Sequence, residues 1–278
     1  MRIVTDSTAD FTLEEAQKLN IDIVPLKVLF GEETYLDRYE LTPEDFYDQL
    51  VNSEKLPTTS QPSPQEFLEY IDMAKKENDS LVIITLASDL SGTYQSAMIA
   101  KEMSEYDKVY VIDSETTTIA QRLLVEKAIK LRDEGKDVEE VFKTLELLKK
   151  RLMVLAFVDT LEYLYKGGRL SRTSKVAGSL LKLKPVIGIV DGKLGSFATA
   201  RGAKKATEAI IKLIDESGGI DMNEDICLGY TGDETGMDKF NEIFIEEYGV
   251  DIKETHFIGP VIGTHAGPGG RAFAYFKK

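Results

Sequence analysis

The feature that most constrains the fold is a repeated alternation of apolar runs with polar loops and helices. Residues 3–5, 23–30, 81–86 and 109–112 are largely apolar runs of strand length, and each leads into a polar loop and a helical segment. Strands separated by helices need crossover connections, which are right-handed and favour parallel pairing. Runs without polar alternation are typical of strands covered on both faces. Residues 1–155 are therefore predicted to form a doubly wound, mainly parallel α/β domain.

Hydroxyl residues mark the predicted helix starts in this half. Thr12 is followed three residues later by Glu15, which is the arrangement of a capping box. Thr42 and Ser63 each precede a proline, a residue well suited to the first turn of a helix. We expect helices to begin after Thr12, Thr42 and Ser63, and we interpret Ser60 and Ser63 as residues that stabilise helix N-termini.

The second half has a different pattern. A strand at 152–158 and a short helix that ends at Gly167-Gly168 are followed by two strands joined through Asp191-Gly192, a dipeptide typical of a tight hairpin turn. The remaining elements are a helix at 202–217, a strand at 225–230, a helix at 235–247 and a strand at 250–257. We predict a smaller, mixed α/β domain over residues 156–278, with the ligand held between and within the two domains.

Charge and composition exclude several classes of protein. With 34 basic and 48 acidic residues the net charge is −14, so we expect neither nucleic acid nor an anionic membrane as a partner. No apolar run reaches the roughly 18 residues that a membrane-spanning helix needs, and no secretory signal precedes the first strand. We expect a cytoplasmic protein without stable membrane insertion. Cys227 lies in an apolar run and is expected in the core.

The loops that follow the predicted strands are rich in hydroxyl groups. In an open α/β sheet, ligands bind where such loops meet helix N-termini. The glycine-rich loops that bind dinucleotides or nucleotide phosphates are absent, which disfavours those ligands. Hydroxyl donors and free backbone amides suit a small anionic group such as a carboxylate. The loops concerned are residues 6–8, 58–60, 88–93 and 113–118.

Two of these loops contain candidate ligand contacts. Thr59 stands outside the Ser63 cap, so its hydroxyl is available to a ligand. Ser91 supplies a donor, and the adjacent Gly92 allows the backbone to approach a ligand closely. A purely structural role is equally compatible with each of them.

Two carboxylates suggest an alternative function. Asp6 and Asp113 follow predicted strands and could hold a divalent metal ion for phosphoryl transfer. No second carboxylate lies in motif spacing with either residue, and no histidine-rich cluster accompanies them. Isolated carboxylates at strand ends more often accept hydrogen bonds from loop amides. A metal-dependent enzyme is therefore kept as the alternative, and we expect no metal and no cofactor.

A basic segment stands out within this acidic chain. Between Lys166 and Lys205 there are ten basic residues and one acidic residue, which gives a local charge of +9. Such an asymmetry indicates a surface for an anionic ligand or partner, although solvated faces of a helix and a hairpin would have the same composition.

Residues 258–270 contain five glycines, two prolines and His265, and we predict a single ordered loop there. His265 could donate a hydrogen bond to a carboxylate.

Taken together, the motifs of this chain resemble those of the DegV family of bacterial fatty-acid-binding proteins. The resemblance rests on five segments in order along the whole chain, namely residues 4–10, 59–63, 90–94, 167–171 and 262–269. It implies a two-domain α/β fold that buries one long-chain fatty acid, such as palmitate, in a tunnel. It also implies a binding protein and not an enzyme.

The resemblance assigns roles to particular residues. Thr59 and Ser91 would hold the carboxylate, with Gly92 beside them, and His265 and Arg169 would lie at the head group. A separate ATP-dependent fatty acid kinase would be the partner and would phosphorylate the carboxylate of the bound acid. Arg172 and Arg201 would serve to dock that kinase.

Overall fold

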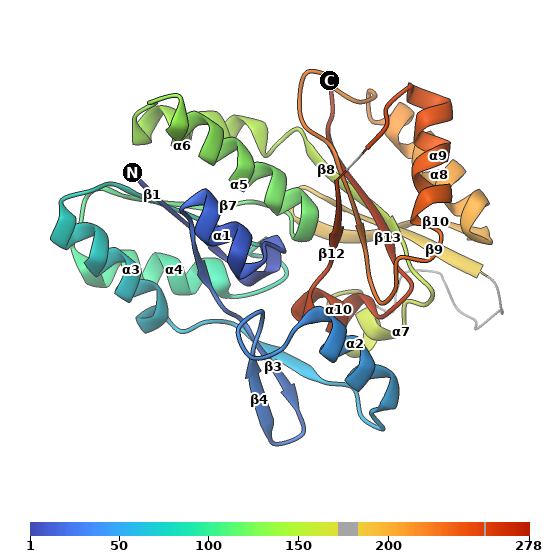
Figure 1. Cartoon of the computed structure of the whole chain (residues 1–278), viewed down its shortest axis with the longest axis horizontal. Helices are drawn as coiled ribbons and strands as arrows, with labels where there is room; N and C mark the ends of the chain where they lie inside the picture. The colour runs from blue at the N-terminus through green and yellow to red at the C-terminus, as the bar shows by residue number, and fades with distance from the viewer. Residues whose placement is uncertain (172–182, 253) are drawn as a thin grey trace.

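The computed structural model describes residues 1–171, 183–252 and 254–278. Within them the strands form a four-stranded, a three-stranded and a six-stranded sheet (Figure 1). Arg172, to which the sequence assigned a docking role, lies outside the described residues. So does part of the basic segment.

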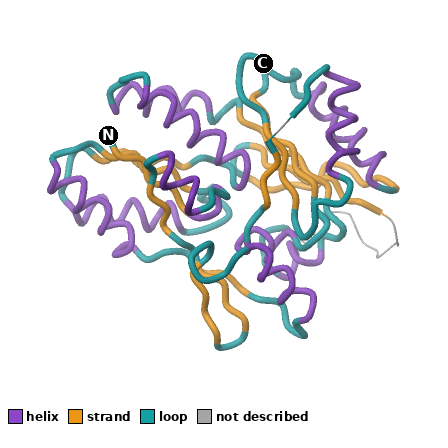
Figure 2. Tube along the Cα trace, viewed as in Figure 1, coloured by secondary structure: helices purple, strands orange, loops and turns teal. Residues whose placement is uncertain are grey.

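The four-stranded sheet has the order β2-β1-β6-β7 and is parallel throughout. Helices cover both of its faces (Figure 2), as predicted for a doubly wound domain. Alternate residues of one strand point to opposite faces. Ile3 therefore packs towards α1, α5 and α6, whereas its neighbour Val4 packs towards α3 and α4. The strands are β1 (Arg2–Asp6), β2 (Asp22–Val24), β6 (Leu81–Thr85) and β7 (Val109–Asp113), and the helices are α1 (Leu13–Leu19), α3 (Pro64–Glu77), α4 (Thr93–Ser104), α5 (Thr118–Asp133) and α6 (Val138–Leu148).

The six-stranded sheet has the order β10-β9-β8-β13-β11-β12 and mixes parallel with antiparallel pairs, which confirms the mixed second half. Asp191 and Gly192 both have positive φ, as the predicted hairpin turn requires. One face of the sheet packs against α8 and α9, while α5 packs against the other face and so touches both large sheets. The elements are β8 (Leu152–Phe157), α7 (Glu162–Lys166), β9 (Leu183–Val190), β10 (Lys193–Arg201), α8 (Ala203–Glu216), β11 (Cys227–Tyr230), α9 (Met237–Tyr248), β12 (Thr255–Phe257) and β13 (Arg271–Phe276).

The prediction of one strand at 23–30 is wrong. Two strands form there, because Pro25 cannot donate a ladder hydrogen bond and the chain changes direction around it. The first, β2, is an edge strand of the parallel sheet. The second, β3 (Lys27–Phe30), forms a separate antiparallel sheet with β4 (Glu33–Leu36) and β5 (Thr58–Ser60). Helix α2 (Pro43–Asn52) packs beside this small sheet.

The predicted single loop at 258–270 contains a helix, α10 (Pro260–Ala266). Gly259 is its N-cap residue and Pro260 occupies the first turn, an arrangement compatible with proline because that turn needs no internal amide donor. The strand expected at 250–257 is shorter than predicted and begins at Thr255.

Three helix starts confirm the sequence prediction. The Thr12 hydroxyl accepts a hydrogen bond from the amide of Glu15, and the Glu15 carboxylate accepts one from the amide of Thr12. The Thr42 hydroxyl accepts a hydrogen bond from the amide of Asp45, and the amide of Ser63 donates one to the Glu66 carboxylate. Each cap satisfies amides that the first turn leaves unpaired.

The predicted domain boundary at residue 155 falls inside β8, all of which pairs in the six-stranded sheet. We therefore propose that the division between the two halves lies ahead of Leu152, in the turn that follows α6.

Gly263 lets α10 approach α2 closely, and we predict that Gly263→Ala destabilises the protein by about 1–3 kcal/mol through overpacking. A Cβ atom at this position would lie 2.5 Å from the Tyr47 hydroxyl and 2.6 Å from the Phe46 ring. Urea unfolding measures the change. Gly195→Ala is the control, because its Cβ would meet only the exposed Phe197 ring, at 3.3 Å. Equal stability of both variants would contradict the proposed packing constraint.

Candidate functional site

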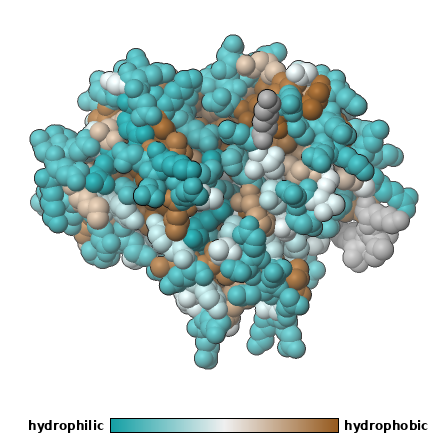
Figure 3. Space-filling model, in the orientation of Figure 1, coloured by the Kyte–Doolittle hydropathy of each residue, from teal (hydrophilic) through white to brown (hydrophobic). Residues whose placement is uncertain are grey.

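A cavity of about 360 Å³ lies between the loops of the parallel sheet and the inner face of the six-stranded sheet. Its volume is within the range of small-molecule sites. The outer face drawn in Figure 3 is mostly hydrophilic, whereas the cavity lining is mostly aliphatic.

The aliphatic wall comes largely from one face of the six-stranded sheet. Residues two apart on a strand share a face, so β8 contributes Val154 and Ala156 while β9 contributes Ile187 and Ile189. The opposite side of the same strands packs against α8 and α9. Further apolar lining residues, from loops, helices and strand β10, are Leu86, Leu90, Leu164, Leu194, Val261 and Ile262.

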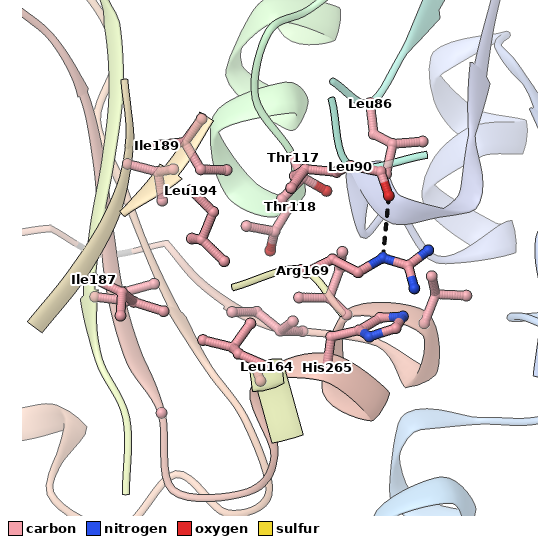
Figure 4. Close-up of a pocket in the computed structure, with 18 of the residues that line it drawn as sticks. Leu86, Leu90, Thr117, Thr118, Leu164, Arg169, Ile187, Ile189, Leu194 and His265 are labelled. Atoms are coloured by element: carbon pink, nitrogen blue, oxygen red, sulfur yellow. Dashed lines mark hydrogen bonds between the residues drawn. The ribbon is translucent and has the colours of Figure 1, made fainter. Parts of the chain in front are cut away.

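Four of the predicted head-group residues meet at one end of this cavity. Thr59 from β5, Ser91 from the loop before α4, Arg169 from the segment after α7 and His265 from α10 all line it. Figure 4 shows Arg169 and His265 on the side away from Ile187, Ile189 and Leu194, so the cavity has a polar and an apolar end. The structure thus brings together residues from four distant parts of the sequence.

The Thr59 hydroxyl is not free, contrary to the sequence prediction. Its Oγ1 lies 2.9 Å from Nε2 of His265, and either atom can be the donor. If His265 donates, the Thr59 hydroxyl can in turn donate to an acceptor in the cavity. This pair joins β5 to α10 directly.

His265 is neutral at physiological pH. Burial and the charge of Arg169 lower its pKa to about 4. Its Nδ1 is buried without a hydrogen-bond partner among the described residues and faces Gly167, where a Cβ atom would lie 2.2 Å from it. The ring is therefore a neutral hydrogen-bonding group beside a cation.

Arg169 is a half-buried cation. Its Nε donates to the Leu90 carbonyl at 3.2 Å, as Figure 4 shows, and its Nη1 donates to the Gly167 carbonyl at 2.7 Å. Throughout the described part of the chain no carboxylate lies within ion-pair distance of it. Burial alone lowers its pKa, since no neighbouring charge opposes the shift. A positive group without a counter-charge favours an anionic ligand.

Ser91 and Gly92 differ in their relation to the cavity. The Ser91 hydroxyl lines it and lies 2.9 Å from the Thr93 hydroxyl. Gly92 is not among the described lining residues, and the Gln61 side chain packs against it and donates to its carbonyl at 3.2 Å. The close approach that Gly92 permits is thus to Gln61, which lines the cavity.

Sequence reasoning missed several polar lining residues. Thr117 and Thr118 belong to a loop recognised as rich in hydroxyls, but neither was singled out. Thr118 has a φ of 54°, a conformation unusual for a β-branched residue and a reasonable signal of function once the structure is known. Arg271 lines another part of the cavity and donates to the carbonyls of Gly270 and Thr235.

The two carboxylates of the alternative function are engaged in holding loops. Asp6 is fully buried and accepts hydrogen bonds from the amides of Thr8 and Leu86. Asp113 accepts from the amides of Ser88 and Glu115. Among the described residues no group of three potential ligands is arranged to hold a metal ion. These observations do not favour a metal-dependent enzyme.

The basic segment is partly neutralised by acidic residues from neighbouring elements. Lys166 pairs with Glu162, and Lys184 pairs with Asp159. Arg201 ends β10 and is exposed.

Cys227 is buried, as predicted, and burial raises the pKa of its thiol well above the ordinary value. None of the described helices is both long and apolar enough to cross a membrane.

Comparisons with known proteins agree with this geometry. The family model described as "Uncharacterised protein, DegV family" matches residues 1–278. A DegV domain-containing protein of Halalkalibacterium halodurans is 39% identical over 276 residues, which are 99% of this chain and 97% of the relative.

Two solved structures share the fold over the whole chain. One, described as fatty acid binding of a DegV family protein from Thermus thermophilus, has a TM-score of 0.88 at 33% identity and covers 100% of both chains. The other is DegV of Bacillus subtilis, described as a fatty acid binding protein, with a TM-score of 0.85 at 35% identity, covering 100% of this chain and 99% of that one.

The lowered pKa of His265 predicts a specific pH dependence of stability. The unfolded chain protonates this ring near its ordinary pKa of about 6.5, whereas the folded protein does so near 4. Between these values only the unfolded chain gains the proton, so the contribution of His265 to stability falls as the pH falls. From pH 7 to pH 5 we expect the difference in unfolding free energy between the wild type and His265→Gln to shrink by about 2 kcal/mol.

Urea unfolding of lipid-free protein at both pH values measures this difference. Burial raises the pKa of Asp37 to about 7 and that of Asp6 to about 6, and both shifts have the opposite effect in this range. The comparison cancels them, because both proteins retain these residues. A difference that is constant with pH would show that His265 is not buried as a neutral ring.

Proposed function

The chain belongs to the DegV family, and from this premise and the chemistry of the cavity we propose that it binds one long-chain fatty acid, such as palmitate. Two family members that cover its whole length, at 33% and 35% identity, are described as fatty-acid-binding proteins. The aliphatic wall would take the acyl chain, and the polar end would take the carboxylate.

The observation that carries this proposal is the environment of Arg169. This guanidinium is half-buried at the polar end of an aliphatic cavity, and no carboxylate of the described chain neutralises it. The groups that accept from its Nε and Nη1 are neutral backbone carbonyls, so its positive charge would still favour an anionic ligand. An amphipathic anion satisfies both requirements, since its charge pairs with Arg169 and its apolar part covers the aliphatic wall.

The hydroxyl groups would complete the head-group site. Thr59 and Ser91 can donate to carboxylate oxygens, and His265 orients the Thr59 hydroxyl through the 2.9 Å contact. A neutral His265 avoids a second buried cation next to Arg169. The proposed role of Gly92 is indirect, because it makes room for the Gln61 side chain that lines the cavity.

We further propose a binding role and not a catalytic one. The groups at the polar end are two hydroxyls, a neutral imidazole and a guanidinium. Thr59 and His265 lie within hydrogen-bonding distance, but Nδ1 of His265 has no partner among the described residues and the pKa of the ring is about 4. The pair therefore lacks the orienting group and the basicity that would activate a nucleophile. Asp6 and Asp113 serve loop structure, so a role in metal-assisted phosphoryl transfer is the weaker candidate. The proposal needs no metal and no cofactor.

The primary test is mass spectrometry of an organic extract of the purified protein, which should contain one long-chain fatty acid per chain.

Thr59→Val should weaken fatty-acid affinity about tenfold, because a hydrogen bond to a charged group is worth about 1.5–3 kcal/mol. Thr58→Val is the matched control, since Thr58 lies on the same strand and is exposed. An extract without fatty acid would contradict the proposed function, whereas equal affinities of the two variants would refute only the head-group role of Thr59.

The family resemblance also supports a protein partner. We propose that an ATP-dependent fatty acid kinase phosphorylates the carboxylate of the bound acid, which would place the chain in the cytoplasm. Arg201 and Arg172 would dock this kinase. Arg201 is exposed at the end of β10 and does not line the cavity described above, so its charge is available to an acidic partner.

Arg201→Ala and Arg172→Ala should retain bound fatty acid but slow acyl-phosphate formation by the kinase, and the difference from the wild type should narrow as salt screens the attraction. Lipid content and kinase turnover are measured on the same preparation. Lys212→Ala is the control, since Lys212 is an exposed cation of α8 outside the basic segment. Variants that lack lipid, or that turn over normally, would contradict the docking role.

A further inference from the structure

Thr117 is an unexplained polar residue inside the cavity. It is the N-cap residue of α5, yet its side chain makes no capping hydrogen bond. The side chain is 6% exposed, and its Oγ1 has no hydrogen-bond partner among the described residues. A buried hydroxyl without a partner is unfavourable, so its retention calls for an explanation.

The surroundings of Thr117 offer further hydrogen-bonding groups. The first turn of α5 contains no acidic residue, and its amides are the unpaired donors that every helix start has. The next residue, Thr118, donates its hydroxyl to the buried Asp10 and retains acceptor capacity. This end of a 16-residue helix is therefore a further polar position beside the aliphatic wall that β8 and β9 form.

Thr117 is also set apart from the head-group site. Both Thr117 and Thr118 line the same cavity as Arg169 and His265. In Figure 4 they lie between those two residues and the aliphatic side chains Ile189 and Leu194. A fatty acid with its carboxylate at Arg169 and its tail along β9 would pass Thr117 with a part of its acyl chain.

We propose that Thr117 is a specificity residue that recognises an oxygen atom on the acyl chain, and that hydroxylated long-chain fatty acids are ligands of this cavity. A hydroxyl on the chain can donate to or accept from Thr117 Oγ1 and can accept from the amides of the first turn of α5. An unsubstituted chain leaves these groups unpaired. This inference rests on the proposed fatty-acid binding and adds the class of acid that fits best.

The test compares stearic acid with a series of positional isomers of hydroxystearic acid, using displacement of a fluorescent fatty acid from lipid-free full-length protein. For at least one isomer, Thr117→Val should weaken binding about tenfold, because the ligand hydroxyl then loses its partner. Binding of stearic acid should stay the same or tighten. Thr117→Ser keeps the hydroxyl and should retain the wild-type preference.

Thr116→Val is the matched control. The Thr116 hydroxyl is equally buried and also has no partner among the described residues, but Thr116 does not line the cavity. The Thr116→Val substitution should leave the affinities for all ligands unchanged. If Thr117→Val changes the affinity for every isomer by the same factor as the affinity for stearic acid, the specificity role is overturned. The Thr117 hydroxyl would then bind only a bridging water. If wild-type protein binds neither stearic acid nor any isomer, the proposed function fails as well.

Discussion

The buried carboxylate of Asp10 joins the three segments on which the cavity depends. One oxygen accepts hydrogen bonds from Arg38 and from the amide of Gly259, and the other accepts from the Thr118 hydroxyl. Gly259 precedes the helix that carries His265, Thr118 begins α5, and Arg38 lies in the loop after β4. Burial raises the pKa of Asp10, and the Arg38 charge opposes that shift. Removing one partner of such a buried pair leaves the other uncompensated, so these segments are held as a unit.

Much of the architecture could be predicted, because it depends on local patterns. The capping residues Thr12, Thr42 and Ser63 and the Asp191-Gly192 turn act through hydrogen bonds and φ values that only neighbouring residues determine. The errors in the predicted elements arose where tertiary contacts determine the local structure. Helix α10 lies in a glycine-rich segment, where Gly263 allows close packing against α2, and no local pattern encodes that contact.

The same distinction between local patterns and tertiary contacts applies to the candidate site. Residue types and loop positions singled out Thr59, Ser91 and His265 as candidates, whereas the head-group role of Arg169 came only from the family resemblance. The contact between Thr59 and His265 joins residues 206 positions apart, so no spacing in the sequence reveals it. Thr117 was overlooked for a related reason. A threonine before a helix predicts a cap, and only the structure shows that its hydroxyl is not used as one.

The relative size of two free-energy terms explains why the cavity combines a long aliphatic wall with few polar groups. Burial of an acyl chain contributes about 0.8 kcal/mol per methylene group, so a chain of about fifteen contributes on the order of 10 kcal/mol. Each charge-assisted hydrogen bond at the head group contributes only about 1.5–3 kcal/mol. The aliphatic wall would therefore supply most of the affinity for the proposed ligand, while Arg169, Thr59 and Ser91 would fix the orientation of the bound acid. A fixed orientation is what a partner that modifies the carboxylate requires, because the reactive group must lie at the same end of the cavity in every loaded molecule.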